Sequence, residues 1–365
     1  MPNTQFDLIF ASDVARLPKQ MLQDLAIDAD LPSEGAVTEL ASRLWATVQQ
    51  TEDGRRRHLS NSLPSIYGGR CSIMWLTFDP GANRVGSRAE ITERFGFDPF
   101  EATIQPTQDQ VGTIPKLIGI AELPDDRYLA RYVVKTRVGR RVSGYGIAED
   151  ATLALLSVFI DQNQGFVEIR GDRRASGATV GVVQQLVSDG LRLQRVSILS
   201  PFNGSIETLA DALNGKLMKA LSKPEALVEN LTDDQLRSVM DILQCVGQYL
   251  EAGDITAVEL TLAAARDTLA TTDADFAGMP FMAVVLAGMR KLNLAAIDQD
   301  LRMLPLYSYL GPVLEHQGGY IVFPVQGQED TEYTIRVGVQ ANTIAFHTPA
   351  TEAALDRVRA VILQL

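Results

Sequence analysis

The first fifty residues carry apolar side chains at helical spacing in two runs, one at residues 17–25 and one at residues 37–48. Apolar positions that recur at i, i+3 and i+4 predict amphipathic helices. Between the runs stands the segment 31–35, Leu-Pro-Ser-Glu-Gly, whose Pro and Gly interrupt the pattern. Residues 51–70 are polar and contain glycine, and we expect them to form a linker.

From residue 71 to about residue 200, the pattern changes to short runs rich in β-branched and aromatic residues, which are typical of strands. Residues 162–165, Gln-Asn-Gln-Gly, predict a hairpin turn, because glycine accepts a positive φ. A helix is predicted at 179–191 and a further strand at 196–199. The strands predicted before that helix are residues 71–78, 116–122, 128–138, 152–160 and 166–170.

Residues 204–316 have helical periodicity almost throughout, and Thr232-Asp233-Asp234-Gln235 matches a capping box that would start one of the helices. Strands return at 320–325, 333–339 and 343–347, and a last helix is predicted at 350–364.

These elements predict an α+β protein with a mixed or antiparallel sheet. We expect five parts along the chain: a helical module at 1–50, a linker at 51–70, an α+β sheet domain at 71–203, a helical region at 204–316, and a β-meander with a C-terminal helix at 317–365.

Composition narrows the function classes. The 365 residues suffice for two or three domains, and two cysteines are too few for a disulfide-built secreted protein. The N-terminus lacks the basic and apolar regions of a signal peptide, and no apolar run is long enough to span a bilayer, so we expect a cytoplasmic protein with no membrane partner. The net charge of -12 means that any contact with nucleic acid must come from a local basic patch.

Residues 17–44 resemble a SAP-type module, a helix–loop–helix unit. The family pattern has Leu-Pro-x-x-Gly in the loop and Glu-Leu-x-x-Arg-Leu in the second helix, matched here by residues 31–35 and by Glu39-Leu40 with Arg43-Leu44. The resemblance implies binding to DNA and sometimes to RNA. Where the family commonly has a Lys after the loop, this sequence has Val37. Arg43 and the following cluster Arg55, Arg56 and Arg57 are the cations that this module offers to phosphates.

In outline, a small helical N-terminal domain followed by a sheet with an arginine-rich hairpin is similar to the kinetochore CENP-N/Chl4 group. No motif supports this second resemblance, so it assigns no residue.

A second basic patch is predicted at residues 131–174, a stretch that contains eight basic and five acidic residues. Lys135 and Arg137 alternate along a predicted strand and should share a face. Arginine forks suit phosphate geometry. The alternative is a solvated sheet face whose cations pair within the molecule. The candidate nucleic-acid ligands of this patch are Lys135, Arg137, Arg140, Arg141, Arg170, Arg173 and Arg174.

Catalytic patterns are weak. Asp161, Glu168 and Arg170 resemble the Asp…Glu-x-Lys arrangement of metal-dependent nucleases, but an arginine stays protonated and cannot replace the lysine as a base. The three histidines and two cysteines show no metal-ligand spacing. We therefore expect no catalytic residue, no metal and no cofactor.

The leading hypothesis is a non-enzymatic nucleic-acid-binding protein, with DNA favoured over RNA. In this hypothesis the helical region serves a protein partner or self-association. The alternatives are a protein–protein adaptor without a nucleic-acid role and, third, a metal-dependent nuclease.

Overall fold

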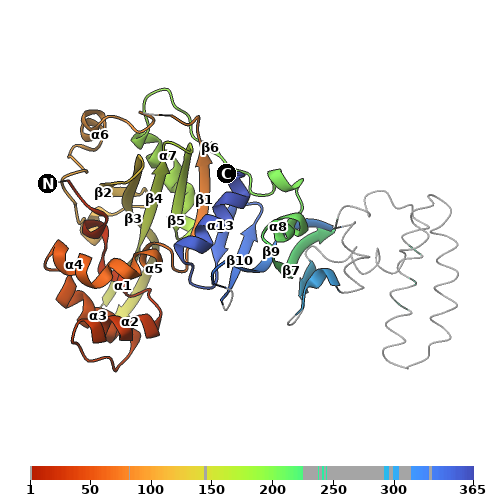
Figure 1. Ribbon diagram of the computed structural model, residues 1–365, viewed down its shortest axis with the longest axis horizontal. Helices are drawn as coiled ribbons and strands as arrows, with labels where there is room; N and C mark the ends of the chain where they lie inside the picture. Colours follow the sequence, from red (N-terminus) through yellow and green to blue (C-terminus); the bar gives the residue numbers. More distant parts are fainter. Residues whose placement is uncertain are drawn as a thin grey trace. The chain divides into compact units, whose positions relative to one another are not determined.

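The computed structural model describes residues 2–81, 83–143, 146–224, 237, 241, 244, 292–295, 299–303, 314–328 and 331–365 (Figure 1). Within these ranges, only the backbone is described for residues 138–143, 146–150, 173, 174, 176, 222–224, 292–295 and 314–317. The chain forms two compact units. The first consists of Met1–Asn203, Thr208–Gly215 and Val322–Leu365, and the second of Gly204–Glu207 and Lys216–Ile321.

The first unit begins with short helices that share one core. They are η1 (Gln5–Leu8), α1 (Ala11–Val14), α2 (Lys19–Asp28), α3 (Val37–Val48), α4 (Glu52–Leu59), η2 (Ser60–Ser62) and α5 (Leu63–Tyr67). In α3, Leu40, Leu44 and Val48 recur every four residues and are all buried. They pack with Leu22 and Leu25 of α2, which confirms the two helices predicted from the pattern.

The polarity of residues 51–70 predicted a linker, but these residues form a helical segment. Thr51 caps α4 by accepting a hydrogen bond from the Gly54 amide. The single apolar residue at the end of α4, Leu59, is fully buried, and α5 adds Ile66 and Tyr67 to the same core. A single buried side chain, Leu59, is enough to dock a helix of about two turns whose other residues are polar.

The sheet of the first unit has the order β2-β3-β4-β5-β1-β11-β10. Every pairing within it whose register is defined is antiparallel, and β6 pairs with β1. This arrangement of helices and an antiparallel sheet confirms the predicted α+β fold. The strands are β1 (Ser72–Thr77), β2 (Lys116–Leu123), β3 (Arg127–Ser143), β4 (Gly146–Asp161), β5 (Phe166–Gly171), β6 (Gln194–Arg195), β10 (Glu332–Gly338) and β11 (Thr343–Phe346).

The β4–β5 turn forms as predicted. Gly165 has a φ of +72°, and a Cβ at this position would lie 2.4 Å from the carbonyl oxygen of Phe78. Only glycine fits both the left-handed backbone and the close approach of the neighbouring chain.

Helices cover both faces of this sheet (Figure 1). On the face that we call the α7 face, α6 (Arg88–Phe95) and α7 (Arg173–Val183) pack on apolar side chains such as Tyr132, Val158 and Ile169. On the opposite face, which we call the α13 face, the N-terminal helices pack on Ala121 and Leu129, and α13 (Glu352–Leu363) reaches β5 through polar contacts.

Two predicted elements between residues 173 and 199 differ from the structure. The helix predicted at 179–191 begins earlier, as α7, and ends at Val183, where η4 (Gln184–Leu186) follows. The strand predicted at 196–199 is absent from the structure. Instead, the short strand β6 precedes it and η5 (Ser200–Phe202) follows it. The remaining 3-10 turn of this unit is η3 (Gln108–Gln110).

The periodicity of residues 204–316 predicted an almost wholly helical region, but the second unit also contains strands. Its described residues include β7 (Lys216–Pro224) and β8 (Leu292–Ala295), which pair antiparallel with Ala220 opposite Leu294. The other elements in these ranges are α8 (Ile206–Ala212), η7 (Leu301–Met303) and β9 (Leu314–Pro324), of which α8 and β9 contribute to both units. The predicted capping box at 232–235 lies outside the described residues.

At the C-terminus, β10, β11 and α13 confirm the predicted hairpin and last helix. Thr351 caps α13 by accepting a hydrogen bond from the Ala354 amide. Among the helices of the described residues, none has the length and apolar character needed to cross a membrane.

Candidate nucleic-acid interface

The SAP-like segment forms two helices joined by a loop, and Arg43 holds that loop in place. Its guanidinium donates to the carbonyl oxygens of Pro32, at 2.5 Å, and of Glu34. Gly35 has a φ of +124°, and a Cβ there would lie 2.6 Å from Oε2 of Glu39. Arg43 was predicted as a phosphate ligand. In the structure Arg43 instead stabilises the loop, because both of its terminal nitrogens donate to loop carbonyl oxygens.

The cluster on α4 divides into paired and accessible cations. Arg55 forms an ion pair with Asp7 at 2.7 Å, and Arg56 pairs with Glu52 one helical turn earlier. Arg57 is exposed, and among the described residues it has no ion-pair partner. Of the three predicted ligands, Arg57 is therefore the one that can contact a phosphate without breaking a contact within the protein.

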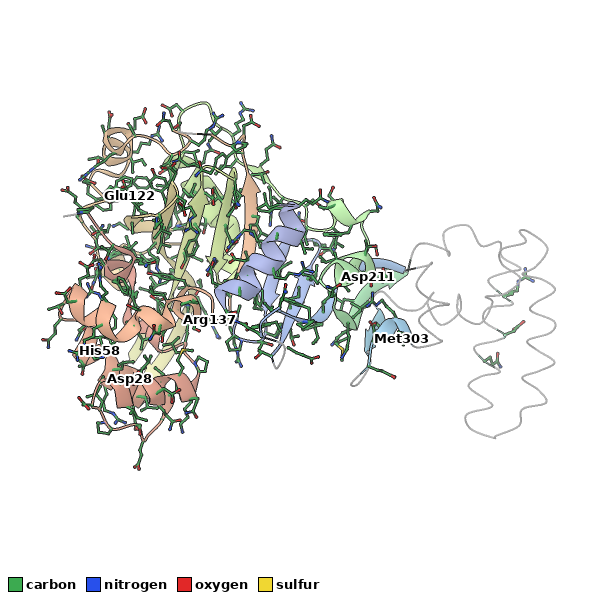
Figure 2. All side chains as sticks on the ribbon, viewed as in Figure 1. Asp28, His58, Glu122, Arg137, Asp211 and Met303 are labelled. Carbon is green, nitrogen blue, oxygen red and sulfur yellow. The ribbon has the colours of Figure 1, made fainter. Side chains whose placement is uncertain are left out.

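Lys135 and Arg137 do not share a face, although simple alternation predicts that they should. Lys135 lies opposite Leu153 and Arg137 lies opposite Thr152, with a β-bulge between them. Because consecutive residues of β4 point to opposite faces, the bulge sends Lys135 and Arg137 to opposite sides of the strand. Arg137 is exposed (Figure 2), whereas Lys135 is half-buried.

Beyond this bulge, β3 and β4 extend as a two-stranded ribbon, which we define as residues 135–152. β2 pairs with β3 only as far as Val133, and β5 pairs with β4 only from Ser157. Within the described part of the sheet, the ribbon strands therefore pair only with each other, and at the base of the ribbon the Lys135 amide donates to the carbonyl oxygen of Gly112. The ribbon has four basic residues on β3 and two acidic residues, Glu149 and Asp150, on β4.

The backbone places the other predicted ligands of this patch in two elements. Arg140 and Arg141 lie in the ribbon, opposite Glu149 and Ala148 respectively. Arg173 and Arg174 form the start of α7. The structure describes the backbone of these four arginines and not their side chains.

Arg170 is buried, which corrects its prediction as a nucleic-acid ligand. Its side chain is 2 % exposed on the α13 face. It donates to Glu168 within its own strand, to Glu352 of α13 at 2.6 and 2.9 Å, and to the backbone carbonyl of Tyr67. The guanidinium carbon also lies 4.0 Å from the centre of the Phe159 ring. A phosphate bound to Arg170 would have to compete with Glu168 and with Glu352 of α13.

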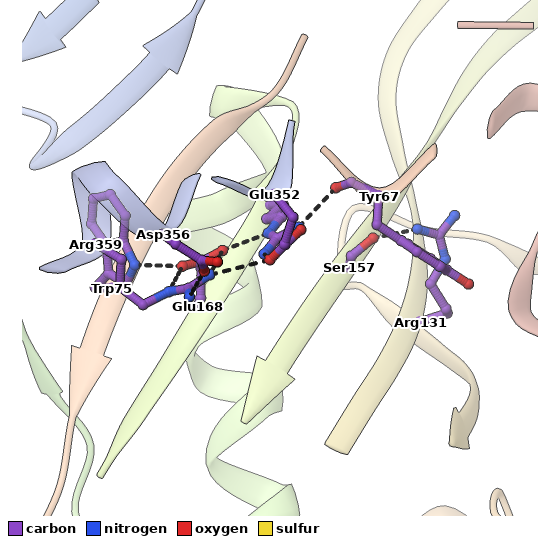
Figure 3. Close-up of polar contacts among 9 residues, drawn as sticks. Tyr67, Trp75, Arg131, Ser157, Glu168, Glu352, Asp356 and Arg359 are labelled. Atoms are coloured by element: carbon purple, nitrogen blue, oxygen red, sulfur yellow. Dashed lines mark hydrogen bonds and ion pairs between the residues drawn. The ribbon is translucent and has the colours of Figure 1, made fainter. Parts of the chain in front are cut away.

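Glu168 is the centre of this buried network. Its oxygens accept hydrogen bonds from Trp75 at 2.8 Å, from Arg359 at 2.6 Å, and from Arg170 (Figure 3). Burial by itself raises the pKa of Glu168, but the charges of Arg170 and Arg359, together with the hydrogen bonds from Arg359 and Trp75, outweigh it and lower the pKa to about 2. Glu168 is therefore ionised at neutral pH, and it ties β1, β5 and α13 together.

A second buried pair lies on the same face. Arg131 donates to both carboxylate oxygens of Asp13 at 2.7 Å and also to Ser157, and each partner of the ion pair is 2 % exposed. The ring of Phe10 lies over its guanidinium, with the ring centre 5.8 Å away. Arg131 thus fixes the first helices to the sheet. Sequence reasoning counted its charge in the basic patch and missed this role, because its partner is more than a hundred residues away.

The geometry disfavours the nuclease alternative. Asp161 and Glu168 lie on the same face, but the two oxygens of Glu168 already accept from three cationic or indole donors. The described residues contain no group of three or more His, Cys, Asp or Glu side chains that could hold a metal ion. A metal at this position would have to replace the contacts that hold α13.

Comparison with protein-family models finds no match for this chain, and comparison with curated proteins finds no similar sequence.

Proposed function

We propose that this chain is a non-enzymatic nucleic-acid-binding protein, with DNA preferred to RNA, and that the ribbon at 135–152 is its main contact. The observation that carries the proposal is the extension of β3 and β4 beyond their sheet neighbours, with Lys135, Arg137, Arg140 and Arg141 on one strand. A protein of net charge -12 repels nucleic acid unless its cations are concentrated in a projecting element of this kind.

The dimensions of the ribbon suit a groove of duplex DNA. At about 3.3 Å per residue, nine residues of β3 span roughly 30 Å. A two-stranded ribbon fits into the major groove, which is about 12 Å wide. Arginines on such a ribbon can form bidentate contacts with phosphates or with guanine edges.

The SAP-like module would provide a second contact through Arg57 on α4. The likeness of residues 17–44 to the SAP pattern supports this assignment, as does the exposure of Arg57. Arg43 contributes indirectly, since it fixes the loop between α2 and α3.

The test compares two triple variants of the full chain. In the first, Arg137, Arg140 and Arg141 are replaced by Gln. In the matched control, Arg127, Arg192 and Arg195 are replaced by Gln, which removes the same charge at three exposed positions outside the ribbon. Point variants are preferable to a truncation, because residues 1–59 share a core with Ala121 and Leu129 of the sheet.

Fluorescence anisotropy with a labelled duplex DNA, a single-stranded DNA and a duplex RNA measures binding. We expect the wild-type protein and the control to bind duplex DNA most tightly, and the ribbon variant to bind it at least tenfold more weakly. Equal affinity of the two variants would remove the ribbon from the interface, and no binding by the wild-type protein at low salt would overturn the proposal.

An adaptor role is the second candidate, and the same ribbon favours it. Its strands pair only with each other in the described residues, and a strand with an open edge can accept a strand from another protein. Absence of binding to all three nucleic acids, together with partners retained from a nuclease-treated lysate and lost in a proline variant of Thr136, would favour this role.

A further inference from the structure

A cleft of about 810 Å³ opens at the end of the sheet opposite to the ribbon, within the first unit. The β2–β3 turn and the β4–β5 turn form one side of it, and residues of α5 and α13 form the other. Its apolar walls include Leu63, Leu123 and Phe159. The proposed contact with nucleic acid does not use this cleft.

Most N–H groups of Arg170 and Arg359, which also line the cleft, already donate to acceptors within the protein. All three nitrogens of the Arg170 guanidinium donate, to Glu168, Glu352 and the Tyr67 carbonyl. The three nitrogens of Arg359 donate to Glu168, Glu352 and Asp356. An anionic ligand would therefore have to compete with carboxylates that already hold both guanidinium groups.

The carboxylates of the cleft, by contrast, have acceptor capacity to spare. The side chains of Asp356 and Glu352 are 57 % and 38 % exposed. Asp161 is 8 % exposed, and its Oδ1 accepts a hydrogen bond from the Gln164 amide at 2.8 Å. In the described residues, its Oδ2 has no hydrogen-bond partner. Asp125 adds a fourth carboxylate at the rim, next to the partly exposed Arg127.

The pKa of Asp356 is raised above its usual value. Burial raises this pKa most; the charge of Arg359 lowers it, and the neighbouring Glu352 raises it again. An additional cation in the cleft would stabilise the ionised form of Asp356.

We propose that this cleft binds an organic cation with an aliphatic stem, namely an alkylammonium or guanidinium group. Its charged end would donate to Asp161 and Asp356, and its methylene groups would pack on the apolar walls. A free diamine and a lysine side chain of a peptide both have this chemistry, and the test separates these two sources.

The test is isothermal titration calorimetry of the full chain with 1,5-diaminopentane, with a tripeptide that has a central lysine and blocked ends, and with glutarate as an anion of similar length. We expect binding of at least one amine and no binding of glutarate. Preference for the tripeptide would identify a protein or peptide as the source of the cation, and preference for the diamine would identify a small molecule.

Three variants locate the binding. Asp161→Asn and Asp356→Asn should each weaken amine binding at least tenfold. Asp28→Asn removes the same charge from the exposed end of α2, which does not line the cleft, and should leave the affinity unchanged (Figure 2). If Asp161→Asn fails to fold, Asp356→Asn alone tests the proposal. This variant should fold, because the carboxylate of Asp356 is more than half exposed. No heat with either amine, equal binding of glutarate, or equal weakening by Asp28→Asn would each overturn the proposal. None of these results depends on nucleic-acid binding.

Discussion

Two stretches of the same sheet use arginine in opposite ways. Arg131 and Arg170 lie where the sheet has neighbours on both sides, and each is 2 % exposed and ion-paired. Arg137 is only six residues beyond Arg131 on β3, yet it is exposed and lies where β2 and β5 no longer pair. The difference shows that the position of an arginine relative to covering helices, rather than the local density of charge, decides whether it stabilises the fold or can contact a ligand.

The buried arginines also show what covers the α13 face. This face carries polar residues on central strands, where an apolar core would be expected. Asp13 comes from α1, and Glu352 and Arg359 come from α13, so each buried charge has a partner on a helix far away in sequence. These contacts fix the helices at defined positions on the sheet, and loss of one partner leaves a buried charge uncompensated.

The largest effect is expected at Arg170. Arg170→Met leaves Glu168 and Glu352 without their main cation, and should lower the free energy of unfolding by about 3–5 kcal/mol. Urea unfolding followed by the fluorescence of the two tryptophans, Trp45 and Trp75, measures this loss. Arg137→Met is the matched control, with an expected change of less than about 0.5 kcal/mol. Similar losses in the two variants would contradict the distinction between the buried and the exposed arginines.

Acid should weaken the same network. Because the pKa of Glu168 is lowered in the folded state, its contribution to stability is present above the unfolded pKa and is lost as the pH falls from about 4.5 towards about 2. A shift of this size corresponds to about 3 kcal/mol at neutral pH. Unfolding measured at a series of pH values should show this loss in the wild-type protein, and a flatter profile in Glu168→Gln. Parallel profiles would show that another group causes the acid sensitivity.

Replacing Arg43 should lower the free energy of unfolding by less than replacing the buried Arg170 and by more than replacing the exposed Arg137. Arg43→Ala removes hydrogen bonds to two loop carbonyls in a partly exposed position, and should cost about 1 kcal/mol. Thermal unfolding measures the cost, with Arg57→Ala as a control on an exposed helix surface. A loss as large as that of Arg170→Met would mean that the loop between α2 and α3 is part of the main core.

The smallest effect on stability is expected from the ribbon itself. The Gln substitutions at Arg137, Arg140 and Arg141 should change the melting temperature by no more than the matched control does, because these residues lie beyond the part of the sheet where β2 and β5 pair with β3 and β4. A clear loss of stability would mean that the ribbon cations pair within the protein, as the alternative of a solvated face with ion pairs predicts.

The local pattern predicted β1, β2 and β5 within a few positions, since alternation and β-branched residues mark them. It predicted β3 only to residue 138 and β4 only from residue 152, and so missed most of the ribbon. It missed the helical character of 51–70, because one buried side chain such as Leu59 docks a helix whose other residues are polar. It also predicted no strand in 204–316, where β7 and β8 form within sequence of helical periodicity.

The candidate site was less predictable, for two physical reasons. A single inserted residue, the bulge at Thr136, reverses the faces of Lys135 and Arg137, and no composition signal marks it. The burial of Arg170 depends on Glu352, which is 182 residues later in the chain. The sequence signal for this burial was that Arg170 follows Glu168 by two residues on an otherwise apolar strand. Such a pattern fits a buried ion pair as well as it fits two exposed charges.

The salt dependence of DNA binding tests the proposed division of the arginines most directly. The slope of the logarithm of affinity against the logarithm of salt concentration reports how many cations contact phosphates. We predict that the ribbon variant at Arg137, Arg140 and Arg141 has a slope smaller by about three than the wild-type slope, about one for each arginine that no longer neutralises a phosphate. The control at Arg127, Arg192 and Arg195 should keep the wild-type slope, and a slope that falls equally in both variants would contradict a ribbon-centred interface.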